Sequence, residues 1–159
     1  MTTILSLDPS AERTISDTGY CYGEFDDNKP FRLLDSGVVR GGFNGFVSRL
    51  NETQDGLDTL YNRILSADIV VCEQFISWEP RADSTPRLIE GVVRYLRPDA
   101  VLQPSSGYKT AVSDDVLKQL GLWTTEGHHA DSRSATRHLI MYLKNNLHRP
   151  TLEAGWING

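Results

Sequence analysis

Apolar and polar residues follow one another in short blocks through the first 40 residues, a pattern typical of strands. It predicts strands at Thr3–Leu7, Gly19–Phe25 and Phe31–Arg40. Residues 26–30 are rich in turn formers, so we expect the second and third strands to form a hairpin. Three antiparallel strands should therefore come first.

Beyond Gly41 and Gly42 the apolar spacing changes to that of a helix, and it leads to a further strand at Ile69–Glu73. The residues that carry this helical spacing are Phe46, Leu50, Leu57, Leu60, Ile64 and Leu65. A strand reached through a helical crossover is usually parallel to its predecessor in the sheet. The sheet should therefore be mixed.

The second half of the chain predicts a helix at Pro86–Arg97, a short strand at Ala100–Gln103 and a long helix at Ala130–Leu147. The first helix places four apolar residues on one face: Leu88, Val92, Val93 and Leu96. Between the short strand and the long helix, Ser113 is a suitable N-cap for a further short helix, which Gly121 would end. These elements predict an α/β domain over residues 1–148, in which helices flank a five-stranded mixed sheet. Residues 149–159 should form a loosely ordered tail.

Composition limits the class of protein more than its function. The apolar content of 39% and the charged content of 23% are ordinary for a soluble domain. No apolar run is long enough to cross a bilayer, and the first residues lack the features of a secretory signal, so we expect a cytoplasmic protein with no membrane contact. Cys21 and Cys72 lie among apolar residues and should be reduced core thiols. The net charge of −5 does not by itself indicate nucleic-acid binding, which depends on how Lys and Arg are clustered.

Three acidic residues each lie at the edge of an apolar run. Asp8 and Glu73 follow predicted strands, and Asp131 opens the last predicted helix. Isolated carboxylates are costly to desolvate, so several that converge indicate a compensating cation. The pattern favours a divalent-metal site.

Four short motifs resemble the RuvC family of Holliday-junction resolvases, within the ribonuclease H-like superfamily, and the phage-encoded branch most of all. They are Ile4–Ser10, Thr18–Tyr20, Val70–Gln74 and His128–Asp131, in the order in which the family has them. The resemblance covers roughly residues 3–147. It implies a ribonuclease H-like fold and a homodimeric, phage-encoded endodeoxyribonuclease, located in the host cytoplasm, that resolves four-way junctions and other branched DNA.

The resemblance also implies roles for individual residues. Asp8, Glu73 and Asp131 would be metal ligands and catalytic residues, with either His128 or Ser134 as the fourth ligand, and we favour His128. Hydrolysis of a phosphodiester by water is served by two divalent ions, here expected to be Mg²⁺ with Mn²⁺ as a substitute. Lys109 would lie near the scissile phosphate. Further expected DNA contacts are Arg133, Arg137, Arg81, Arg87 and Phe75, the last inserted at the junction centre.

Each of these residues also has a purely structural explanation. Asp8 could cap a turn, and Glu73 could pair with an arginine. Asp131 could be a negative charge at the start of a helix, where the helix dipole stabilises it. His128 and Lys109 could be ordinary loop residues, and Phe75 could be a core or dimer residue. Arg133 and Arg137 could form ion pairs within their own helix or a solvated face. At the level of function, the alternatives are a branched-DNA-binding module without catalysis and a related nuclease acting on RNA–DNA hybrids or flaps. A nucleotide-binding domain of the sugar-kinase type is disfavoured because no second Gly-rich phosphate loop occurs.

Overall fold

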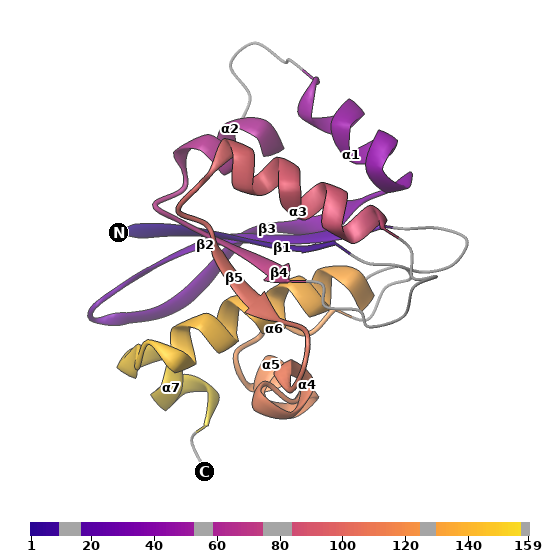
Figure 1. The fold of residues 1–159 in the computed structure, drawn as a ribbon. Helices are drawn as coiled ribbons and strands as arrows, with labels where there is room; N and C mark the ends of the chain where they lie inside the picture. The colour runs from indigo at the N-terminus through magenta and orange to yellow at the C-terminus, as the bar shows by residue number, and fades with distance from the viewer. Residues whose placement is uncertain (10–16, 53–58, 75–83, 125–129, 157–159) are drawn as a thin grey trace.

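A five-stranded sheet with helices on both faces forms the centre of the protein (Figure 1). The computed structural model describes residues 1–9, 17–52, 59–74, 84–124 and 130–156, with Ala130 and Asp131 described by their backbone only. The strand order is β3-β2-β1-β4-β5. The α/β class and the mixed sheet predicted from the sequence are confirmed.

The first three strands are antiparallel, as predicted. They are β1 (Thr2–Pro9), β2 (Thr18–Asp26) and β3 (Lys29–Val39). The register pairs Asp8 with Gly19 and Pro9 with Thr18, so the end of β1 lies beside the start of β2.

The helical spacing after Gly41 belongs to two helices, α1 (Gly42–Leu50) and α2 (Leu60–Ser66). Helix α2 begins where the Thr59 side chain accepts a hydrogen bond from the Asn62 amide, an N-cap that the sequence analysis did not identify. The chain then enters β4 (Ile69–Gln74), crosses through α3 (Thr85–Leu96) and reaches β5 (Val101–Pro104). Strands β4 and β5, which the crossover helix α3 joins, are parallel as expected, and β4 is also parallel to β1, its other neighbour in the sheet.

Two apolar cores cover the two faces of the sheet. On one face α1, α2 and α3 bury a core that includes Leu5, Leu7 and Cys72. On the other face lie α4 (Tyr108–Ala111), α5 (Asp114–Gln119), α6 (Ala130–Asn145) and α7 (Arg149–Gly155), over a core that includes Ile4 and Cys21 (Figure 1). Both cysteines are free and buried, as predicted. Among the described residues, no helix is long and apolar enough to span a membrane.

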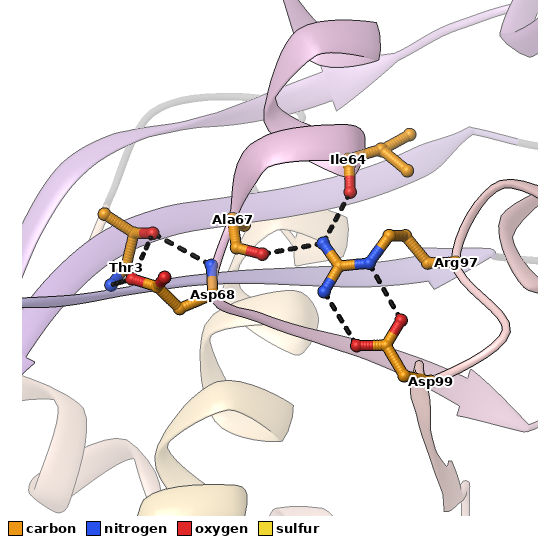
Figure 2. Close-up of polar contacts among 6 residues, drawn as sticks. All are labelled: Thr3, Ile64, Ala67, Asp68, Arg97 and Asp99. Carbon is orange, nitrogen blue, oxygen red and sulfur yellow. Dashed lines mark hydrogen bonds and ion pairs between the residues drawn. The ribbon is translucent and has the colours of Figure 1, made fainter.

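Side-chain hydrogen bonds fasten the end of the sheet where β1 and β4 begin (Figure 2). The Thr3 amide donates to the Asp68 carboxylate, and the Asp68 amide donates in return to the Thr3 hydroxyl. Beside them, Arg97 donates to the backbone carbonyls of Ile64 and Ala67, which end α2, and forms two hydrogen bonds with Asp99. This contact satisfies carbonyls that the end of a helix leaves without partners.

Two details of the second half differ from the sequence analysis. In α3 the buried residues are Pro86, Ile89 and Val93, while Leu88, which the sequence analysis grouped with Val93 on one apolar face, is 49% exposed. Residues 149–155, expected to be loosely ordered, form α7 and bury Thr151, whose hydroxyl accepts a hydrogen bond from the Phe31 amide. Pro150 suggested a loose tail, but it occupies the first turn of α7, where proline needs no amide partner.

Candidate metal centre

Asp8 and Glu73 lie side by side at the end of two parallel strands. Leu7 of β1 pairs with Cys72 of β4, and the two acids are the next residues along each strand. Side chains alternate between faces, and Ile4 and Val71 both point into the core beneath α6. Asp8 and Glu73, an even number of residues further on, therefore point to that same face.

His138 joins the two acids from α6. One ligand atom each of Asp8, Glu73 and His138 lie within 4.8 Å of one another. The His138 Nε2 atom is 3.7 Å from Glu73 Oε2. Asp8 is 5% exposed and His138 fully buried, so the group is shielded from water. These three residues form the candidate metal centre.

The His138 ring has no hydrogen-bond partner among the described residues, although both of its nitrogens are buried. A buried polar atom without a partner costs free energy, so such an atom calls for an explanation. The backbone carbonyl of His138 does have a partner, since it accepts a 2.8 Å hydrogen bond from the Gln103 side chain on β5. The unsatisfied nitrogens, lying beside two carboxylates, are what a bound cation would explain.

Burial also sets the charge state of the group. It raises the pKa of the Glu73 carboxyl from 4.5 to about 7, and the positive charge of Lys109 opposes this rise. Burial lowers the pKa of His138 from 6.5 to about 4, so its imidazole is neutral at pH 7. Neutral imidazole is the form that binds metal ions.

The donor set fits a divalent ion. Two carboxylates are ligands of the kind that Mg²⁺ and Mn²⁺ prefer, and a neutral imidazole adds a ligand better suited to transition metals. An ion among them would replace the mutual repulsion of the two acids with attraction and would occupy an imidazole lone pair.

The other predicted ligands are placed only in part. Asp131 lies in the first turn of α6, the helix that carries His138, but its side chain is outside the described residues. His128 lies outside them altogether, as do Phe75 and Arg81. Ser134 is described; its hydroxyl oxygen is 3.5 Å from the Tyr108 hydroxyl and is not one of the three clustered ligands.

The basic residues divide into exposed and buried ones. Lys109, in α4, is exposed, and its charge acts on Glu73. Arg133 is partly exposed, donates to the Thr124 carbonyl at 2.6 Å and lies over the Trp123 ring, 4.8 Å from its centroid. Arg87 is exposed in the first turn of α3.

Arg137 differs from the expectation of a DNA contact. It is 7% exposed, donates to the Val112 carbonyl and pairs with Asp114. The alternative of an ion pair accounts for it, except that the partner is on α5 instead of on its own helix. We therefore leave Arg137 out of the DNA contacts proposed below.

His138 is the site residue that the sequence analysis missed. Its position does carry a signal, because residues seven apart lie two turns along the same helix face, and His138 follows Asp131 by seven. The two candidates named from the sequence, His128 and Ser134, each lie three positions from Asp131. Tyr108 and Gln103, which contact His138, come from other elements and have no such local signal.

Comparisons with known proteins bear on the fold. No protein-family model matches the sequence, and no curated protein is significantly similar to it. Among solved structures, RuvC from Thermus thermophilus in complex with a Holliday junction substrate superimposes with a TM-score of 0.57 at 15% identity, covering 92% of this chain and 96% of that one. A second structure of Thermus thermophilus RuvC gives a TM-score of 0.55 at 16% identity, covering 91% and 97%. The chain therefore has the RuvC fold.

Proposed function

We propose that this protein is a metal-dependent endonuclease that resolves Holliday junctions and other branched DNA. The observation that carries the proposal is the convergence of Asp8, Glu73 and His138 in a buried group at the end of the central strands. The shared fold supports it, since one of the similar structures is a RuvC bound to a Holliday junction substrate. The motif resemblance to phage-encoded members supports a phage origin.

In this function Asp8 and Glu73 hold the metal through carboxylate oxygens and His138 through its neutral ring. When bound, divalent ions supply an activated water and stabilise the charge on the leaving oxygen. Asp131, at the start of α6, is a further proposed ligand. Lys109 carries a positive charge that acts on Glu73 and would also attract the phosphate to be cleaved.

DNA backbone contacts are supplied by cations on the α4–α6 side of the sheet. Trp123 lies between two of them, with Lys118 Nζ and Arg133 Cζ each 4.8 Å from its ring centroid. Lys109, whose charge acts on Glu73, would join them in a DNA-binding surface. Such a surface reconciles binding of a polyanion with the net charge of −5. Arg81, Arg87 and Phe75 stay predicted contacts.

A homodimer would match the near two-fold symmetry of a four-way junction, since paired incision calls for two centres related by a C2 axis. The outward face of α3 is the proposed contact. It exposes Leu88 (49%) and Tyr95 (85%), two turns apart on one side of the helix. A dimer would bury this apolar surface.

Cleavage of three substrates tests the activity. A synthetic four-way junction, a linear duplex and an RNA–DNA hybrid are each incubated with the protein and either Mg²⁺ or Mn²⁺. We expect paired nicks in the junction alone. Preferential cleavage of the hybrid would refute the resolvase assignment, and binding without cleavage in either metal would refute catalysis.

Matched variants test the site. Glu73→Gln and Asp8→Asn should abolish cleavage and leave junction binding measurable, because they remove metal ligands and not phosphate contacts. Glu153→Gln, the same change at an exposed acid on α7, should leave cleavage unchanged. His128→Ala and Ser134→Ala decide between the two candidates for a further ligand.

A further inference from the structure

Tyr108 lies flat against the ring of His138. The two ring centroids are 4.4 Å apart, and the angle between the ring planes is 26°. The Tyr108 hydroxyl is 3.5 Å from the hydroxyl of Ser134, one helical turn before His138 on α6. The tyrosine therefore covers α6 along the face that carries the imidazole. It does so from α4, a single turn that starts after Gly107, whose positive φ of 82° favours glycine.

The orientation of the imidazole is otherwise weakly defined. Gln103 fixes only the backbone carbonyl of His138, and neither ring nitrogen has a hydrogen-bond partner among the described residues. A metal-binding histidine usually has its ring orientation fixed by a hydrogen bond to the nitrogen that does not bind the metal. Here no such bond is present among the described residues, and the contact that the structure shows for the ring is its stack with Tyr108.

We propose that Tyr108 is a positioning residue, which holds the His138 ring so that one nitrogen faces Asp8 and Glu73 and binds the metal ion. This inference rests on the metal centre of the proposed function. It adds that a ring stack, and not a hydrogen bond, orients the nitrogen ligand. Helix α4 would then act on the metal centre through two residues. Tyr108 orients His138, and Lys109, the next residue, places a positive charge that acts on Glu73.

Mn²⁺ binding to the purified full chain tests the proposal without measuring cleavage. The dissociation constant is measured from the EPR signal of free Mn²⁺, and pulsed EPR detects the ¹⁴N coupling of a directly bound imidazole. The variants are Tyr108→Phe, which keeps the ring but not the hydroxyl, and Tyr108→Leu, which removes the ring. Tyr22→Leu is the control, because Tyr22 is a partly buried tyrosine that packs on the opposite face of the sheet. Thermal unfolding of each variant is recorded, and Tyr108→Met replaces Tyr108→Leu if the latter does not fold.

We expect ¹⁴N coupling in the wild type and in Tyr108→Phe, with similar dissociation constants. Tyr108→Leu should raise the dissociation constant about 10-fold or more, the usual effect of losing a contact that orients a ligand, and should lose the coupling. If Tyr108→Leu keeps both the affinity and the coupling, Tyr108 does not position the ring. Mn²⁺ binding that Glu73→Gln abolishes, but that shows no ¹⁴N coupling in the wild type, would overturn the inference and leave the proposed function standing. No Glu73-dependent binding would overturn both.

Discussion

The buried carboxyl of Glu73 should make the metal-free protein less stable as the pH rises. Its pKa is about 7 in the folded chain, against an ordinary value of 4.5. At about 1.4 kcal/mol per pH unit, this difference amounts to about 3 kcal/mol. Because the folded-state pKa is raised, this stability is fully present below pH 4.5 and is lost as the pH rises through 7.

Glu73→Gln isolates this effect. Glutamine stays neutral, so the variant should match the wild type near pH 4.5 and exceed its unfolding free energy by about 3 kcal/mol at pH 8.5. His138, whose pKa is lowered to about 4, acts in the other direction: its contribution is present above pH 6.5 and is lost as the pH falls through 4. It is present in both proteins, so their difference reports Glu73 together with its interaction with His138, 3.7 Å away.

Urea unfolding of the EDTA-treated proteins, followed at half-unit pH steps, measures the difference. Adding Mn²⁺ at pH 8.5 should stabilise the wild type by about 2.7 kcal/mol at 100 times its dissociation constant, and should not stabilise the variant. A stability difference that does not change between pH 4.5 and 8.5 would show that Glu73 is not desolvated as described. Such a result would also refute the metal centre as described.

Three further predictions concern other parts of the molecule. Arg97→Met should lower the unfolding free energy by about 3 kcal/mol, since it leaves two helix-end carbonyls without a charged donor. Asp99→Asn is the control and should barely move the urea midpoint, because Asp99 is exposed. Thr151→Val should cost about 1 to 3 kcal/mol in the same assay, because the buried Phe31 amide loses its acceptor; an unchanged midpoint would contradict that role. Lys109→Gln should reduce the slope of log binding constant against log salt concentration by about 0.9 on junction DNA, and Lys29→Gln on the far hairpin should not.

The strands and the two strand-end acids could be predicted because their signals are local. Apolar runs, turn formers and the crossover rule are read from consecutive residues, and they placed Asp8 and Glu73 at the ends of two strands. That these strands are parallel neighbours, which brings the acids together, is shown by the structure.

The missed features depend on tertiary contacts. His138 occupies a buried position of α6, where a helix usually carries an apolar residue. The residues next to it in the sequence do not show that β1 and β4 bring two carboxylates to it. The burial of Arg137 depends on Asp114 and the Val112 carbonyl, which belong to a different part of the fold. Ile89, and not Leu88, faces the sheet because the tilt of α3 is set by its packing on β1 and β4.

The hydrogen bonds between Thr3 and Asp68, and those of Arg97 with the carbonyls that end α2, lie at the opposite end of β1 from Asp8. Asp8 lies six residues after Thr2 along the extended strand β1. This separation corresponds to about 20 Å. The N-terminus lies at the start of β1 (Figure 1), so an affinity tag or fluorophore joined ahead of Met1 would lie at the end of that strand away from Asp8. Molecules tethered to a surface by that end should keep the proposed DNA-binding edge open, which suits single-molecule observation of junction binding.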